Sequence, residues 1–289
     1  MSLTIYPMYQ SGGIGDMLRA AVSFYVFAKK NNIPFYFDFS SVPGMECCFI
    51  YEKNRYLNGP VVNLHFINGF VDAKDNSLNA IYNVILENKN THYRITSNSI
   101  GFVAWREILD VLPEFRGLLK PSTVVSNRIA QLQEQYNLVD NSYISVHIRC
   151  GDFYTDSKFI YCKGDKRIKK LTNEYVLSIL SQIDNLKSPL PIVIHADNDK
   201  FKKMMKEKIK ENIKILENKI QHTSIRPDIA RNNAGYIDTI AEFYILANSA
   251  KIVQFNYSGF SHWAAIMGDT PFLSLQPDCQ VLYYINETS

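Results

Sequence analysis

The sequence has little of what marks membrane, metal-binding or disulfide-rich proteins. Its 289 residues include two Trp and five Cys, and no two cysteines form a CxxC pair. An odd number of scattered cysteines favours reduced thiols and offers no metal-ligand pattern. No run approaches the roughly 20 apolar residues that cross a bilayer, and the first residues do not resemble a signal peptide. We therefore expect a cytoplasmic protein with no metal, no cofactor and no stable membrane insertion.

Strong charge is also lacking, since the formal net charge is +3. That value is too small to indicate nucleic acid as the main partner. One lysine-rich run covers 200–219, and its apolar residues recur at three- and four-residue spacing. This spacing predicts a single amphipathic helix with lysines on its solvent face.

Strands and helices alternate along most of the chain. We expect strands at 3–8, 34–39, 61–67, 143–148, 191–195 and 251–255, and helices at 17–30, 108–119, 122–135, 173–183, 200–219 and 237–248. Apart from its one strand, the stretch 40–100 is expected to be irregular and to shape an acceptor pocket. The alternation predicts an α/β fold with parallel sheets in two domains, at 1–125 and 126–289, that face a cleft.

The first candidate motif, GGIGD at 12–16, lies between an expected strand and an expected helix. Gly13 and Gly15 would let the backbone approach a ligand closely, and the helix start would offer amides to an anion. The motif is neither a P-loop nor a complete dinucleotide fingerprint. A tight strand-to-helix turn without a ligand is the alternative.

The second motif, HIRCGD at 147–152, follows a buried strand. In an open α/β sheet, ligands bind at the carboxyl ends of strands. Arg149 can hold two phosphate oxygens, and His147 is expected beside it as a further donor-binding residue. Asp152 would orient the arginine or hold a ribose hydroxyl. The alternative is a structural Arg–Asp pair beside a buried, hydrogen-bonded His147.

The third motif, HADN at 195–198, again follows a strand. Its Asp197 can accept a hydrogen bond from a base or a ribose. The alternative is that Asp197 or Asn198 caps the helix that follows.

The fourth motif, SGFSHWAA at 258–265, opens an apolar helix. Its residues Ser258, Gly259, Phe260 and Ser261 would present backbone amides and hydroxyls to an anion. An ordinary serine helix cap is the alternative.

These motifs, in this order, resemble those of the fucosyltransferase superfamily, which includes α-1,2, α-1,6 and protein O-fucosyltransferases. The helix AEFYILANSAKIV at 241–253 is similar to the acidic-x-x-x-Leu run that precedes the last motif in those enzymes. The resemblance spans nearly the whole chain as ordered landmarks. It implies a GT-B fold of two Rossmann-like domains, an acceptor-side one at 1–125 and a nucleotide-sugar-binding one at 126–289.

The resemblance also implies roles for single residues. It makes Arg149 the pyrophosphate ligand and the 258–261 segment a second phosphate contact. Asp197 becomes a guanine or ribose contact, and Gly13 and Gly15 line the donor from the other domain. We expect a carboxylate, Asp16 first and Glu242 or Asp238 after it, to take the acceptor proton. The sequence departs from the family pattern at two positions. Asp16 stands where many relatives have Asn, which could not act as a base. His262 stands where the α-1,2 enzymes have Trp, which changes the shape near the donor and bears on the identity of the sugar.

The expected function is inverting, metal-independent transfer of a deoxyhexose to a glycan hydroxyl, with fucose from GDP-fucose as the first choice. A different nucleotide sugar, such as GDP-rhamnose, is an alternative within the same fold. A non-catalytic relative that binds a glycan or nucleotide is a second alternative. Glycosidase chemistry comes third, because no pair of flanking carboxylates is visible in the sequence.

Overall fold

The computed structural model divides the chain into two compact units. The first contains 1–125 and 221–237, and the second contains 126–220 and 238–289. The structure describes residues 1–6, 13–40, 42, 44–52, 60–66, 77–88, 90–97, 105–150, 159–162, 167–218, 233–256, 258–275 and 281–285.

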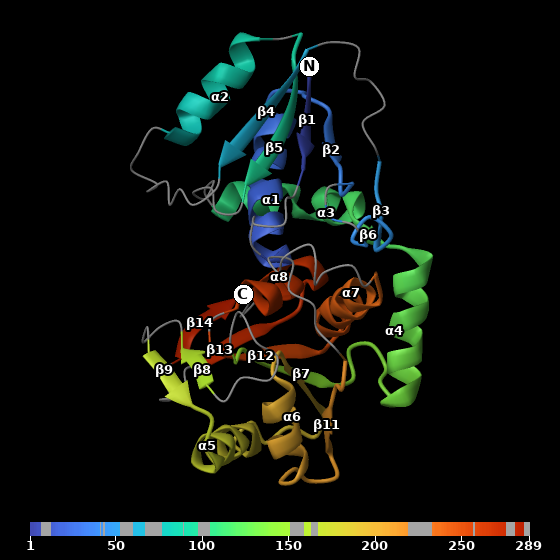
Figure 1. Cartoon of the computed structure of the whole chain (residues 1–289), viewed down its shortest axis with the longest axis vertical. Coiled ribbons are helices and arrows are strands. Elements are labelled where there is room, and N and C mark those ends of the chain that lie inside the picture. The colour runs from blue at the N-terminus through green and yellow to red at the C-terminus, as the bar shows by residue number, and fades with distance from the viewer. Residues whose placement is uncertain are drawn as a thin grey trace. The chain divides into compact units, whose positions relative to one another are not determined.

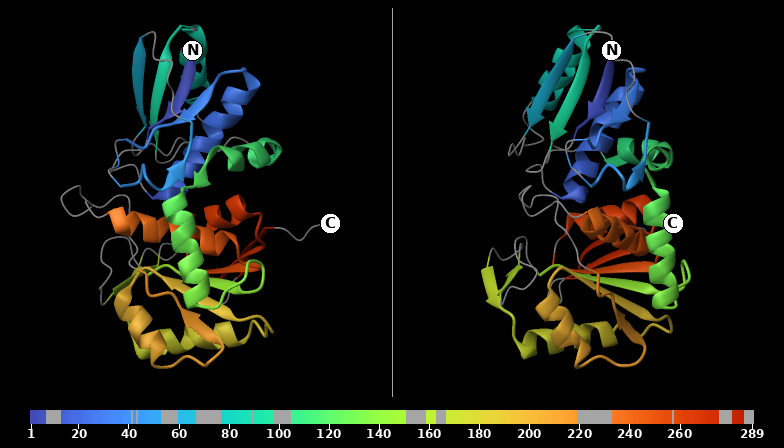
Figure 2. Two further views of the ribbon diagram at one scale, coloured as in Figure 1. Left: turned by 90° about the vertical axis from the view of Figure 1, so that its right-hand side faces the viewer. Right: turned by 45° about the vertical axis from the view of Figure 1, so that its right-hand side comes forward.

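The first unit is built on a four-stranded parallel sheet of order β2-β1-β5-β4. Its elements are β1 (Ser2–Ile5), α1 (Ile14–Lys30), β2 (Phe35–Phe37), β3 (Phe49–Ile50), β4 (Val61–Phe66), α2 (Ser77–Glu87), β5 (His92–Ser97), α3 (Trp105–Leu118) and β6 (Lys120–Pro121). Helix α1 lies along this sheet (Figure 2) and is buried on nearly all sides from Ile14 to Ala28. Apolar residues around its whole circumference account for that burial.

The second unit is built on a six-stranded sheet of order β11-β10-β7-β12-β13-β14. Its elements are α4 (Thr123–Gln135), which begins at the boundary, β7 (Ile144–Ile148), β8 (Phe159–Cys162), β9 (Arg167–Lys170), α5 (Asn173–Asp184), β10 (Ile192–Ala196), α6 (Asp199–Lys206), β11 (Ile213–Ile215), α7 (Asn233–Ala247), β12 (Lys251–Phe255), α8 (Gly259–Gly268), β13 (Phe272–Leu275) and β14 (Val281–Ile285). Every pairing is parallel except that of β13 with β14. The predicted α/β fold with parallel sheets is therefore confirmed.

Helices cover both faces of this sheet. In Figure 1, α5 and α6 lie on one face, and α7 and α8 lie on the other. Side chains of α5 and α6 join one apolar cluster with alternate residues of the strands, among them Val146, Ile194 and Val253. The opposite face carries the intervening residues, because side chains alternate along a strand.

The prediction of an irregular segment at 40–100 is wrong in its second half. The strand at 61–67 is confirmed as β4, but α2 and β5 were missed. Strand β5 lies between β1 and β4. Its sequence HYRITS alternates Tyr93 and Ile95, which are buried, with polar residues. A short alternating strand of this kind carries a weaker sequence signal than a continuous apolar run.

The prediction of one helix over the lysine-rich run is also wrong. Helix α6 ends at Lys206, and β11 follows at the edge of the sheet. Ile213 and Ile215 are buried and pair with β10. A spacing of apolar residues that suits a helix continues into β11, where two β-branched residues at i and i+2 suit a strand better.

Among the described residues, no helix combines the length and the apolar character that crossing a membrane would require.

Candidate functional site

The order of strands in the second unit defines where a ligand would lie. From β7, the chain adds β10 and β11 on one side and β12 and β13 on the other. Open α/β sheets bind ligands at such a switch point, outside the carboxyl ends of the strands. Arg149 directly follows β7, Asp197 follows β10, and Asn256 follows β12. The three residues therefore come together at the end of the sheet where binding is expected.

Arg149 and Asp197 form an ion pair through Nη1 and Oδ2. The other carboxylate oxygen of Asp197 accepts a hydrogen bond of 2.6 Å from the backbone N–H of Cys150. The side chain of Asp197 is 7% exposed, whereas that of Arg149 is 17% exposed. Asp197 thus fixes the guanidinium at the end of β7. This is the orienting role that we had expected of Asp152, which lies outside the described residues.

This pairing follows from strand register. His195 pairs with His147 and Ala196 with Ile148, so the next step places Asp197 opposite Arg149. The pair can be predicted from the sequence when the two motifs are aligned as the ends of neighbouring strands. The predicted base or ribose contact of Asp197 stays a prediction.

Asn256 was missed by the sequence analysis. It adopts a left-handed backbone conformation (φ 62°), which Asn tolerates better than most residues. Its Nδ2 donates to the backbone O of Arg149 at 2.8 Å and lies 3.2 Å from the hydroxyl of Tyr175. Asn256 therefore holds the backbone of Arg149 from the β12 side. An Asn directly after a strand is the signal that could have found it.

The first turn of α8 contains the fourth motif. Ser258 is the N-cap, and its Oγ accepts from the backbone N–H of Phe260 at 3.3 Å. Ser261 is fully buried and donates to Gln254 Oε1 at 2.7 Å. Its one hydroxyl proton is thereby engaged within the protein. The cap thus engages the backbone N–H of Phe260, and the start of α8 at Gly259 remains a helix N-terminus of the kind that suits an anion.

The two polar residues that end the third motif, Asp197 and Asn198, have different partners. Asn198 caps α6, with its Oδ1 accepting from the backbone N–H of Phe201 at 2.8 Å. The capping alternative is therefore confirmed for Asn198, while Asp197 turns to Arg149.

His147 is buried behind Arg149. Its Nδ1 lies 3.0 Å from Ser261 Oγ, and its ring lies beside that of Phe260. Burial, followed by the charges of His195 and Arg149, holds the pKa of His147 well below its usual range. The ring is therefore neutral, since the charged form loses its hydration without gaining a carboxylate partner. Burial also raises the pKa of the Cys150 thiol, so this thiol is unsuited to nucleophilic chemistry.

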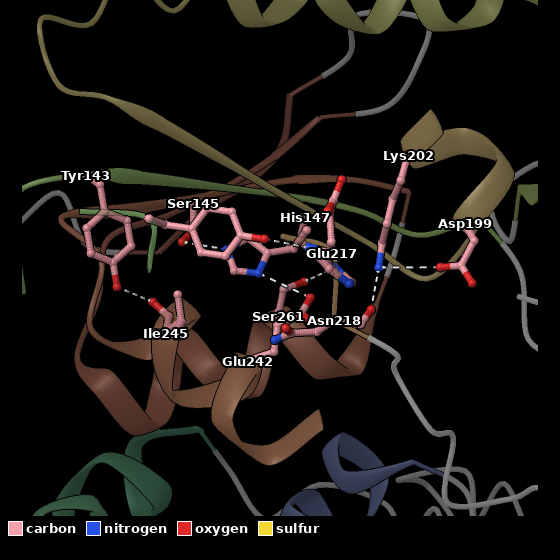
Figure 3. A network of polar contacts seen from close by, with 12 residues as sticks. Tyr143, Ser145, His147, Asp199, Lys202, Glu217, Asn218, Glu242, Ile245 and Ser261 are labelled. Carbon is pink, nitrogen blue, oxygen red and sulfur yellow. Dashed lines mark hydrogen bonds and ion pairs between the residues drawn. The ribbon is translucent and has the colours of Figure 1, made fainter. Parts of the chain in front are cut away.

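Glu242 lies on α7 and is fully buried, with Oε1 3.2 Å from His195 Nδ1. His195 Nε2 in turn lies 3.2 Å from Ser145 Oγ. Figure 3 shows Glu242 and Ser145 between the sheet and the helices that cover it. The carboxylate of Glu242 is thus enclosed within the second unit, and its role as a base stays a prediction. Asp238, the third carboxylate expected as a possible base, forms an ion pair of 2.7 Å with Arg128.

Gly13, Gly15 and Asp16 lie together at the start of α1 in the first unit. Helix α1 begins at Ile14, earlier than predicted, with Gly13 as N-cap and Gly15 in the first turn. The carboxylate of Asp16 is 44% exposed and pairs with Arg19 at 3.1 Å. A helix N-terminus stabilises a negative charge, so this position suits a carboxylate.

Known proteins resemble this chain in structure, whereas comparison by sequence finds no match. No protein-family model matches the chain, and no curated protein has a significant sequence match. The fold matches fucosyltransferase NodZ from Bradyrhizobium over 99% of both chains, with a TM-score of 0.61 and 12% identity. It matches a mutant of Arabidopsis thaliana FUT1 in complex with GDP over 95% of this chain and 70% of that one, with a TM-score of 0.59 and 13% identity.

A third similar structure is POFUT1 in complex with GDP-fucose. It matches over 93% of this chain and 95% of its own, with a TM-score of 0.51 and 13% identity. At identities this low, the structural similarity establishes the fold alone. The chain has a fucosyltransferase-like GT-B fold, as the resemblance of its motifs predicted.

Proposed function

We propose that the chain is an inverting glycosyltransferase that moves a deoxyhexose, fucose from GDP-fucose first, to a glycan hydroxyl. One observation carries the proposal: Arg149 stands at the switch point of the second sheet, held by Asp197 and Asn256. A guanidinium fixed there is preorganised to meet a pyrophosphate. Among the solved structures of similar fold, the FUT1 mutant is in complex with GDP, POFUT1 is in complex with GDP-fucose, and a NodZ crystal was soaked with GDP-fucose.

The proposed reaction is a single displacement. The acceptor oxygen forms a bond to the anomeric carbon while the bond from that carbon to the phosphate oxygen breaks. GDP leaves with the electron pair, and Asp16 takes the acceptor proton. Arg149 and the amides at the start of α8 stabilise the charge that grows on the leaving phosphate. This role requires no metal ion, so we expect a chelator such as EDTA to leave turnover unchanged.

Ligand-induced stabilisation tests the donor class. We expect GDP, and neither UDP nor ADP, to raise the melting temperature, because a ligand at 100 times its Kd stabilises by about 2.7 kcal/mol. Turnover of GDP-fucose and GDP-rhamnose, with and without a glycan acceptor, then identifies the sugar and separates an enzyme from a binding protein. Stabilisation by UDP alone would contradict the donor assignment.

Substitution of Arg149 tests the site itself. Arg149→Ala should lower turnover by about 10²–10³-fold, the usual effect of losing one transition-state donor. Arg149→Lys is the matched control, since it keeps the charge and loses the planar fork. We expect it to retain a small part of the activity. Near-normal turnover by a folded Arg149→Ala variant would refute the assignment.

A further inference from the structure

A row of polar side chains crosses the six-stranded sheet at one register position. His195, His147, Gln254 and Ser274 come from β10, β7, β12 and β13 and pair in that order. Each is at most 5% exposed. Polar groups in a core are costly unless they are hydrogen-bonded. Each of the four side chains accordingly has a hydrogen-bond partner.

Gln254 connects the row to the first turn of α8. Its Nε2 donates to Ser274 Oγ at 3.2 Å, and its Oε1 accepts from Ser261 Oγ at 2.7 Å. Ser261 Oγ also lies 3.0 Å from Nδ1 of His147 (Figure 3). A hydroxyl has one proton, and Ser261 gives it to Gln254, so towards His147 its oxygen accepts. His147 therefore carries its proton on Nδ1, and its Nε2 keeps a lone pair.

The orientation of the Gln254 amide decides this outcome. With the amide reversed, Nε2 would donate to Ser261, and Ser261 would donate its own proton to Nδ1 of His147. The proton of the neutral imidazole would then move to Nε2. The two amide orientations thus correspond to two tautomers of a histidine two residues from Arg149.

We propose that Gln254 is a positioning residue, which acts through Ser261 to hold His147 in the Nδ1–H tautomer and so presents its Nε2 as an acceptor. Nε2 has no partner among the described residues. A lone pair there suits an N–H or O–H group of a nucleotide sugar. That last step rests on the proposed function, whereas the tautomer itself does not.

A consequence concerns Ser261. Its hydroxyl proton is committed to Gln254, so it cannot also donate to a phosphate while this chain of bonds holds. The geometry therefore makes Ser261 a link in the chain, and leaves phosphate contact to the backbone at the start of α8.

The tautomer can be read directly by NMR. Protein with ¹⁵N-labelled histidine gives separate nitrogen signals for protonated and unprotonated ring positions, and His147→Gln identifies the signals of His147. We expect Nδ1–H in the unsubstituted protein. Gln254→Glu keeps an acceptor toward Ser261 and should retain that tautomer. Gln254→Met removes the acceptor at similar size and should give a mixture of tautomers.

Binding of GDP supplies the functional readout. For Gln254→Met we expect a Kd for GDP weakened about fivefold, roughly the value of one net hydrogen bond, with Gln254→Glu closer to the unsubstituted protein. An Nε2–H tautomer in the unsubstituted protein, or one tautomer in all variants, overturns the proposal. Ser261→Ala breaks the same link with a smaller change, and an unchanged tautomer there also overturns it. A predicted tautomer shift without any GDP binding would support the role of Gln254 and reject the proposed function.

Discussion

The two faces of the six-stranded sheet differ in kind, although they are built from adjacent residues. One register position carries Ile194, Val146, Val253 and Leu273, and the next carries His195, His147, Gln254 and Ser274. The apolar row packs against α5 and α6. Both rows are buried, and strands of a parallel sheet buried on both faces normally read as continuous apolar runs.

The two faces contribute differently: one stabilises the unit, and the other positions side chains. Apolar burial is non-directional and contributes roughly in proportion to area, so the α5–α6 face can stabilise the unit without fixing any particular atom. Hydrogen bonds on the α7–α8 face have direction and fix ring orientation and protonation. Arg149 directly follows β7, which contributes Val146 to the apolar row and His147 to the polar row.

The largest expected effect comes from the apolar face. Ile179 on α5 is fully buried there. Ile179→Ala should lower the free energy of unfolding by about 2–5 kcal/mol, the usual cost of such a cavity. Because the side chain of Ile179 contributes packing and no hydrogen bond, the Kd for GDP of the folded variant should not change. Urea unfolding measures the free energy of unfolding, and calorimetry measures the Kd for GDP. A large loss of GDP affinity would contradict the division between a stabilising face and a positioning face.

A smaller effect is expected where the two helices of the polar face meet. A Cβ on Gly268, near the end of α8, would lie 2.1 Å from the backbone oxygen of Ala247 in α7. Backbone must therefore move, and Gly268→Ala should cost about 1–3 kcal/mol. Gly117 on α3 has nothing within 4 Å of its added Cβ, so Gly117→Ala is a matched control. Thermal unfolding of both variants checks this, and equal melting temperatures would contradict it.

The smallest effect is a pH dependence that belongs to the polar face. Burial, with His195 and Arg149, holds the pKa of His147 well below its usual value. As pH falls below about 6.5, the unfolded chain takes up a proton that the folded protein refuses, so the free energy of unfolding decreases. The slope from this one group is at most about 1.4 kcal/mol per pH unit. Above that pH, His147 does not change the free energy of unfolding.

His147→Gln removes this contribution. Urea unfolding at about pH 7.5 and about pH 5.5 should show a smaller acid-induced loss in the variant than in the unsubstituted protein. Parallel losses in the two proteins would mean that His147 is not kept neutral by the fold.

How far the sequence predicted the molecule depended on the strength of local patterns. Strands β7, β10 and β12 are short apolar runs, and the structure places them within one residue of the prediction. The lysine-rich run failed because helical spacing extended past Lys206 into β11. Contacts between distant elements, such as Glu242 of α7 with His195 of β10, leave no local signal.

The site was predicted residue by residue but not as a set of contacts. Arg149 was found from its motif, but its ion pair with Asp197 was not predicted. Asp152, expected to orient the arginine or to hold a ribose hydroxyl, lies outside the described residues, and its role stays a prediction. Strand pairing supplies what was missing, because it places the residues after β7 and β10 opposite each other. The donor roles of these residues remain predictions.

The central claim is that Arg149 binds the diphosphate of the donor, and calorimetry with GDP and guanosine tests it most directly. The account predicts that GDP binds the unsubstituted protein at least tenfold more tightly than guanosine, a difference of about 1.4 kcal/mol or more. Arg149→Ala should remove most of that difference and leave guanosine binding unchanged, since the backbone at the start of α8 still contacts the phosphates. An Arg149→Ala variant that still prefers GDP over guanosine by the same factor would contradict the account.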